Sequence, residues 1–415
     1  MSALGDNVRK HRRQAGLSQL ELAGAADLSP STVAKVEQGG SCSMETLHTI
    51  ARALDVKTSQ LLAEDPPERE RCNRPERLNL RDLRIALTPP IALSAPTGSR
   101  ELPRDEPDMY RLRREARDAA LLYPAGRYES LAATLPGLVR AADAAVAYFT
   151  DGEERRQALL ARAEVLGLVG RYLNQVRQFD MAHTVVRGAI ADAQEADDVV
   201  AVAARVRGLC FVLLRTGRFD EAEAMAVEAM DLVEPRITGA DPDRYAVWGG
   251  VAMEAAAAAI RNNRPQEAGE YRRAASVAAT AIGHQHQYGL PGSDCFGPVT
   301  AAMKSLEDPM IVGDAQAVVR RAEEEEALTS RAWKRLGTPG KNDRNRFALD
   351  VARAHVRTGD SARAEEELVR LCRVAPNWLD QQNMAAYTWE EVAAKRKRTL
   401  TPEMREVGRH LGVIG

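Results

Sequence analysis

Residues 17–39 constrain the fold of this chain more than any other stretch, because they carry the start signals of two short helices separated by a tight turn. Ser18 precedes Glu21 by three residues, which is the spacing of a capping box, where each side chain accepts a hydrogen bond from the backbone amide of the other residue. Ser29 is a favoured N-cap residue, and Pro30 fits the first helical position because its missing N–H is not needed there. The stretch therefore predicts a helix, a turn and a second helix.

The second of these helices has a buried side and a polar side. Val33 and Val36 are three residues apart and so fall on one face. Ser31, Thr32 and Lys35 fall on the other face, where short polar and cationic side chains are free to enter a DNA groove. The alternative interpretation is a small helical module that contacts another protein.

The first 63 residues resemble the Cro/C1 (XRE-type) helix-turn-helix domains of phage and bacterial repressors. The motif residues that carry the resemblance are Ser18-Gln19-Leu20-Glu21-Leu22-Ala23, Ser29, Thr32-Val33 and Glu37-Gln38-Gly39. The flanking segments VRKHRRQAG and METLHTIARALDVKTSQLLAE also match. The resemblance implies a five-helix DNA-binding domain over residues 1–63.

That resemblance also implies roles for individual residues. Gln19 opens the first helix of the motif against a phosphate or a base edge, and Arg12 pairs with Glu37 to hold the domain together. The residues expected at DNA within the motif are Gln19, Ser29, Ser31, Thr32 and Lys35. Two positions depart from the usual pattern, because Pro30 stands where many relatives place a base-reading side chain and Asp27 stands where glycine is common. These two departures do not affect the expected fold, but they leave the operator sequence open.

Charge gives little further support, since residues 1–63 hold seven Lys and Arg against six acidic residues. A local basic cluster does exist over residues 9–13, from which Arg9 and Arg13 are candidates for phosphate contacts that fix register without reading sequence. A single module of this size buries little surface, so we expect a homodimer on a two-fold site in double-stranded DNA.

At 415 residues the chain is too long for one compact domain, and its net charge of −2 argues against a general polyanion-binding protein. Its five cysteines are scattered without metal-ligand spacing, which is typical of reduced thiols. We see neither a signal peptide nor a segment apolar enough to span a bilayer. The sequence predicts a cytoplasmic, nucleoid-associated protein without a membrane partner.

Residues 64–108 are rich in proline and charge, which is typical of an extended linker. Leu80, Leu83, Ile85 and Leu87 predict one short helix inside it. The arginines of this segment allow a second interpretation, an arm that follows DNA phosphates.

Residues 109–415 read as one helix after another, with no alternating strand pattern. A weak repeat places a turn between successive helices. The six expected turns are residues 125–128, 177–180, 216–220, 263–266, 312–314 and 358–360. The clearest copy, TGRFDEAEAMAVEAMDLVEP, resembles a tetratricopeptide repeat, although the spacing exceeds the usual period of about 34 residues. The fold class is therefore all-α, with the helix-turn-helix domain followed by a right-handed solenoid that has a concave inner face.

A helix-turn-helix domain joined to such a solenoid resembles two groups of bacterial regulators. One group is the Gram-positive peptide-pheromone receptors of quorum sensing. The other, more specific, group is the actinobacterial regulators of secondary metabolism and development, and its motifs are 128–131, 135–138, 296–298, 344–352 and 375–376. Both resemblances imply that residues 109–415 sense a signal and dimerise. This chain departs from relatives after two of those motifs, at Val299, Thr300, Lys304, Gln381 and Gln382, so its ligand can differ or be absent.

A groove that binds a peptide or a small molecule needs polar side chains that both donate and accept, which asparagine does. The candidate ligand-binding residues are Asn174, Asn342, Arg344, Asn345 and Arg346, the arginines for a carboxylate or phosphate. Asn262 and Asn263 have the alternative of being turn residues. His284 and His286 lack further ligands nearby, so we expect a polar loop there and no metal or other cofactor.

Three hypotheses follow from these patterns. The first is a ligand-sensing transcriptional regulator, the second is a regulator whose solenoid only dimerises or docks a partner, and the third is a protein scaffold that does not bind DNA. The chain contains no phosphate-binding loop, nucleophile elbow or paired-carboxylate arrangement, so we do not expect an enzyme.

Overall fold

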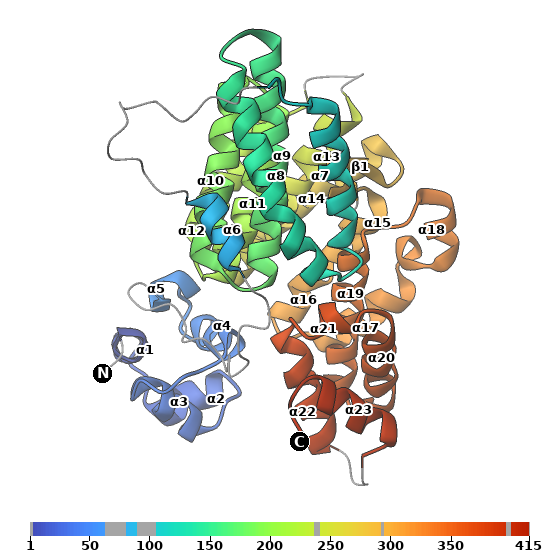
Figure 1. Cartoon of the computed structure of the whole chain (residues 1–415). Helices are drawn as coiled ribbons and strands as arrows, with labels where there is room; N and C mark the ends of the chain where they lie inside the picture. Colours follow the sequence, from blue (N-terminus) through green and yellow to red (C-terminus); the bar gives the residue numbers. More distant parts are fainter. Residues whose placement is uncertain are drawn as a thin grey trace.

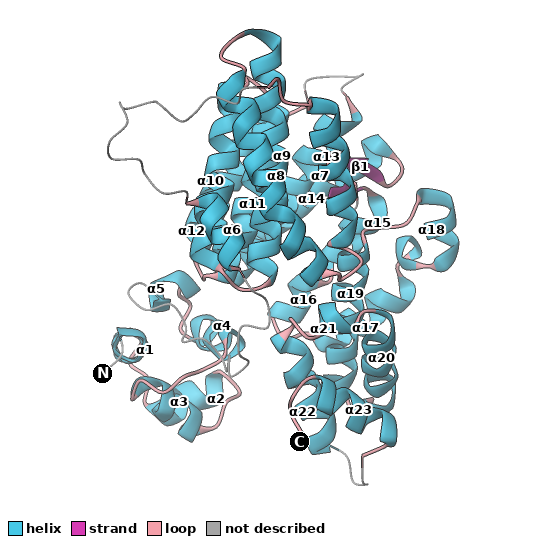
Figure 2. Cartoon of the chain, in the orientation of Figure 1, coloured by secondary structure: helices cyan, strands magenta, loops and turns pink. Residues whose placement is uncertain are grey.

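The computed structural model describes residues 3–62, 80–88, 105–235, 241–291, 294–395 and 400–414. Figures 1 and 2 show that helices make up almost all of this part of the chain, which confirms the predicted all-α class. None of the helices in the described ranges combines the length and the apolar character that a membrane span requires.

The first five helices form a small N-terminal domain, here called the head. Its helices are α1 (Ala3–Gln14), α2 (Gln19–Ala25), α3 (Pro30–Glu37), α4 (Met44–Ala53) and α5 (Thr58–Leu62). Leu22, Val33, Leu47 and Ile50 are fully buried at its centre. Gly5 lets α1 approach the end of α3 closely, because a Cβ at this position would lie 2.8 Å from the Val36 carbonyl oxygen.

The short helix predicted inside the linker is present as α6 (Arg81–Leu87). Leu80 and Leu83 are buried against the helices that follow, and the Arg84 guanidinium donates to Gln178 Oε1 at 3.0 Å. The arm hypothesis concerns six arginines, of which Arg81 and Arg84 belong to α6 and the other four, Arg69, Arg71, Arg74 and Arg77, lie outside the described residues.

A long stack of helices, here called the helical region, follows from residue 109. Its first part contains α7 (Met109–Leu122), α8 (Tyr128–Tyr148), α9 (Gly152–Gln175), α10 (Phe179–Glu195), α11 (Val199–Arg215), α12 (Phe219–Val233), α13 (Pro242–Arg261) and α14 (Pro265–Ile282). Its second part contains α15 (Pro298–Ser305), α16 (Glu307–Ile311), α17 (Ala315–Glu324), the 3-10 turn η1 (Glu326–Leu328), α18 (Ser330–Leu336), α19 (Lys341–Thr358), α20 (Ser361–Val374), α21 (Pro376–Leu379), α22 (Asn383–Lys395) and α23 (Pro402–His410).

From α7 to α17 each helix packs against the one that follows it. In addition, α7 contacts α9, α9 contacts α11, and α11 contacts α13. Each of the six turns predicted from the sequence lies at a junction between two helices, and five of them overlap a helix end by one or two residues. Small side chains make close packing possible, as in α13, where Ala252, Ala255 and Ala258 are fully buried. The tetratricopeptide-like character of the stack stays a prediction.

One element, a two-stranded hairpin that begins at His286 and ends at Phe296, was not predicted from the sequence. Its strands β1 (His286–Tyr288) and β2 (Asp294–Phe296) pair antiparallel, with His286 opposite Phe296. Strands of three residues are too short to show an alternating pattern. Tertiary packing fixes the hairpin instead, because the buried Phe296 ring fills the space beside Gly249 of α13.

The head rests on one edge of the helical region, below the ends of α11 and α12 in Figure 1. The Asn262 amide oxygen accepts the backbone N–H of Ser59 at 3.0 Å, and its amide nitrogen donates to Asp220 at 2.9 Å. The Asn263 amide donates to the Val56 carbonyl oxygen at 3.3 Å. Both asparagines thus lie at a turn, which was one of the two interpretations of the sequence. Both also form hydrogen bonds that attach the head to the helical region.

Charged side chains extend the same contact. Arg52 of α4 donates to the Ile311 carbonyl oxygen at 2.8 Å, and Lys57 lies 3.3 Å from the Asp220 carboxylate. Glu45 accepts hydrogen bonds from Arg353 and Arg357 of α19. The docking face of the head is therefore made by α4, α5 and the turn between them.

Candidate nucleic-acid interface

Two serine caps set the helix starts of the motif. Ser18 accepts the Glu21 amide at 3.2 Å, and the Glu21 carboxylate accepts the Ser18 amide at 2.7 Å, so the predicted capping box is complete. Ser29 accepts the Thr32 amide at 3.1 Å and starts α3, with Pro30 in its first turn. The turn between these helices holds Asp27 in the left-handed region at φ 50°.

Three hydroxyl groups gather at the start of α3. The Ser29 hydroxyl lies 2.8 Å from that of Ser31 and 2.7 Å from that of Thr32. Ser29 and Ser31 are exposed and Thr32 is half-buried. Because a hydroxyl both donates and accepts, this group can pair with donors and acceptors on base edges or with a phosphate.

Lys35 is the exposed cation one turn further along α3. Its aliphatic stem crosses Gly40, where an added Cβ would lie 2.6 Å from the Lys35 Cγ atom. The Gly40 amide also donates to the Lys35 carbonyl oxygen at 2.8 Å. Gly40 therefore orients Lys35, a contact that the sequence pattern did not indicate.

On the buried side of α3, Glu37 is fully buried and forms the ion pair with Arg12 that the sequence predicts. Its carboxylate accepts Arg12 Nε at 2.5 Å and Arg12 Nη2 at 3.0 Å. Gln19 Nε2 donates to the same carboxylate at 2.7 Å. Burial raises the pKa of Glu37, but the hydrogen bonds from Arg12 and Gln19 outweigh it and hold the pKa below the usual value.

Gln19 and Arg9 therefore differ from the free side chains that the sequence suggested. Gln19 is half-buried at the start of α2, and its amide nitrogen donates to the Glu37 carboxylate. Arg9 donates to the Glu37 carbonyl oxygen at 2.7 Å and lies 3.6 Å from Asp6. Arg13 is exposed on α1, as a phosphate-contacting residue must be.

The exposed face of α3, formed by Ser29, Ser31 and Lys35, is separate from the docking face. Within the described ranges, no hydrogen bond or ion pair joins α2 or α3 to the helical region, and Figure 1 shows both helices below α4 and α5, away from the ends of α11 and α12.

The candidate ligand residues of the helical region lie in two places. Asn174 is on α9, 3 % exposed, with its amide oxygen lacking a partner in the described structure. The other four lie in the first two turns of α19, where Arg346 pairs with Asp350 at 3.1 Å. The Asn345 amide nitrogen and Arg344 Nε are also enclosed without partners. Unsatisfied polar atoms of this kind are expected where a ligand or ordered water binds.

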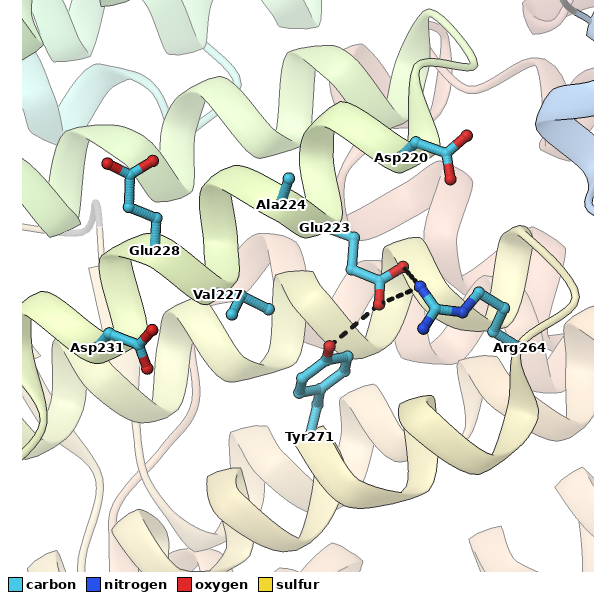
Figure 3. Close-up of a pocket in the computed structure, with 8 residues that line it drawn as sticks. All are labelled: Asp220, Glu223, Ala224, Val227, Glu228, Asp231, Arg264 and Tyr271. Atoms are coloured by element: carbon cyan, nitrogen blue, oxygen red, sulfur yellow. Dashed lines mark hydrogen bonds and ion pairs between the residues drawn. The ribbon is translucent and has the colours of Figure 1, made fainter.

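A hollow of about 520 Å³ lies between α12 and α14. Figure 3 shows Glu223 inside it, accepting hydrogen bonds from Arg264 at 2.7 Å and from the Tyr271 hydroxyl at 3.0 Å. Asp220, Glu228 and Asp231 add further carboxylates. This negative lining repels phosphate, so the hollow does not extend the nucleic-acid interface.

Residues 8–61 match a family model described as helix-turn-helix. No curated protein matches the chain. The head is thus a helix-turn-helix domain of the Cro/C1 type, followed by a long all-helical region, and this match is what indicates DNA-binding transcriptional regulation.

Proposed function

We propose that this chain is a sequence-specific, DNA-binding transcriptional regulator that acts in the cytoplasm as a homodimer on a two-fold operator. The observation that carries the proposal is the helix-turn-helix match over residues 8–61 together with an α3 face that is exposed and free of the docking contacts. The proposal assigns it no catalytic reaction.

The proposed roles follow from the positions of the side chains. Ser31, Thr32 and Lys35 reach base edges in the major groove, while the Ser29 hydroxyl orients the first two. Arg13 and the start of α2 at Gln19 contact phosphates. Arg12 and Glu37 act through the fold of the head and do not read sequence.

We further propose that the helical region senses a peptide or a small molecule, with Asn174 and the start of α19 contributing to the ligand site. The support is the set of buried polar atoms without partners on both elements. The head is held by the turns around Asp220 and Asn262 and by α19, so a change in helix stacking shifts the head. Coupling between two sites is typically worth ~1–3 kcal/mol, enough to change operator occupancy five- to about a hundredfold.

The test begins with selection of binding sites from random duplex DNA by the full-length chain, followed by affinity measurements at stated salt. We expect an enriched two-fold site, and Thr32→Ala and Lys35→Ala to weaken binding to it by about ten- to a hundredfold, as loss of a base contact does. Arg273→Ala, an exposed change on α14, is the matched control. No enriched sequence across a salt series, with the variants still folded, would support the scaffold hypothesis instead.

A further inference from the structure

Arg215 ends α11 and has no charge partner. It is half-buried, and within the described part of the chain it makes no hydrogen bond or ion pair. Its Nε atom is enclosed without an acceptor. Because a guanidinium stays charged in proteins, an enclosed one without an anion is costly to the fold.

The surroundings of Arg215 add to this cost. Burial together with Arg346, Arg177 and Arg261 lowers the pKa of Arg215 to about 10. Each of these neighbours already has an acceptor of its own. Arg346 pairs with Asp350, Arg177 donates to Asn383, and Arg261 pairs with Glu307. The available acceptors are therefore engaged by other cations.

Around Glu307, too, cations outnumber carboxylates. Although burial raises its pKa, Lys304, Arg261 and Arg346 lower it well below the usual value. One carboxylate thus serves several cations, and Lys304 lies as far as 3.9 Å from it. The space around Arg215 is left with excess positive charge.

An aromatic surface lies beside this charge. Phe211 is one turn before Arg215 on α11, and its side chain is 41 % exposed. The Arg215 guanidinium carbon lies 6.0 Å from the centre of its ring, and Lys304 Nζ lies 5.9 Å from it. Two cations therefore flank a ring that solvent can reach.

We propose that Arg215 and Lys304 anchor a binding site for an oxyanion, carboxylate or phosphate, whose flat apolar part packs on Phe211. The site gives the sensing role of the proposed function a ligand class, and its regulatory meaning rests on that function. The existence of the site does not rest on the proposed function, because all the charged groups that argue for it belong to the helical region.

The test is calorimetric titration of the full-length chain with benzoate, phenyl phosphate and inorganic phosphate at matched ionic strength. We expect benzoate or phenyl phosphate to bind with a dissociation constant of about 1 mM or tighter, and the stronger of the two identifies the anion. Arg215→Gln should weaken binding at least tenfold. Phe211→Ala should weaken the aromatic probes and leave inorganic phosphate unchanged, whereas Arg273→Gln, an exposed control on α14, should change nothing.

A second measurement needs no ligand. Since Arg215 is an uncompensated cation, Arg215→Gln should raise the melting temperature of the unliganded chain while it removes binding. A lower melting temperature would show that Arg215 already has a stabilising partner and would overturn the site. Absence of binding by all three probes, or unchanged affinity in Arg215→Gln and Lys304→Gln, would overturn it as well.

The two proposals fail in distinguishable ways. If the probes bind but no operator is enriched, the oxyanion site stands and the regulator does not. If an operator is enriched while the probes do not bind, the regulator stands and the oxyanion site is wrong.

Discussion

His48 of the head and Phe219 of the helical region stand ring to ring, with centroids 5.9 Å apart and planes inclined by 38°. Phe219 is fully buried and belongs to the apolar core of the head, although α12 supplies it. The head therefore completes its core with a side chain from the helical region. Loss of this contact would expose apolar surface on both parts, which makes the docked arrangement the stable one.

Acid should weaken this junction through His48. Burial, then Arg261 and Arg52, lower the pKa of His48 to about 3 from an unfolded value of 6.5. The folded protein thus keeps His48 neutral while the unfolded chain takes up a proton, so stability is full above pH 6.5 and is lost as pH falls toward 3. The expected slope from this group is about 1.4 kcal/mol per pH unit.

The measurement is the free energy of unfolding in urea at several pH values for the parent chain and for His48→Gln. The variant keeps a hydrogen-bonding group near Thr58, whose hydroxyl lies 3.2 Å from His48 Nδ1. We expect a shallower pH dependence in the variant. Parallel curves for the two proteins would show that His48 does not control the acid response.

Asp27→Gly should stabilise the head. Asp27 adopts φ 50° in the turn between α2 and α3, a region that costs a residue with a Cβ roughly 1–2 kcal/mol and costs glycine little. We expect a gain of about 1 kcal/mol, seen as a higher melting temperature. Ala34→Gly, inside α3, is the matched control and should lose about 1 kcal/mol. A lower melting temperature for Asp27→Gly would mean that the Asp27 side chain stabilises the turn.

Local patterns made the head and the turns predictable from the sequence. The caps at Ser18 and Ser29 involve residues no more than three positions apart, so spacing alone indicates them. The α-helical turns of the long region are local in the same sense, and each predicted turn is present. Such signals do not require knowledge of the tertiary structure.

Long-range contacts account for what the sequence did not show. Asn262 binds Ser59 across a separation of 203 residues, and no local pattern distinguishes a docking asparagine from an ordinary turn residue. The hairpin depends on Phe296 filling space beside Gly249. Arg215 is one arginine among many in the sequence, and only the folded arrangement shows that its neighbours leave it without an acceptor.

Glu37→Gln should destabilise the head strongly. The change removes the charge that Arg12 faces at 2.5 and 3.0 Å and leaves that guanidinium buried without a counter-charge. We expect a loss of about 3 kcal/mol in the free energy of unfolding of the head, together with weaker DNA binding. Because the folded pKa of Glu37 lies below its unfolded value of 4.5, the contribution is present above pH 4.5 and is lost as pH falls through the folded pKa.

Asp6→Asn is the control for this change, because Asp6 is exposed and lies 3.6 Å from Arg9. Exposed ion pairs contribute less than about 1 kcal/mol, so this variant should unfold nearly as the parent chain does. Equal losses of unfolding free energy in the two variants would show that Glu37 contributes no more to stability than an exposed charge does.

Glu45→Gln should loosen the docking of the head without unfolding it. Glu45 accepts from both Arg353 and Arg357, and these arginines are mostly buried while Glu45 is 38 % exposed. Hydrogen bonds to charged groups are worth about 1.5–3 kcal/mol, and partial exposure places this pair of bonds at about 2 kcal/mol together. The docked arrangement should therefore open roughly 30-fold more often in the variant.

Amide hydrogen exchange at Ser59 reports that opening, because its N–H is bonded to Asn262 across the junction. We expect exchange at Ser59 to accelerate by about 30-fold in Glu45→Gln, while amides in the buried part of α13 keep their protection. Glu153→Gln removes a carboxylate from an exposed pair with Arg156 and should leave Ser59 unchanged. Unchanged exchange in Glu45→Gln would mean that Phe219 and Asn262 hold the head without α19, and the proposed influence of α19 on the head would then be excluded.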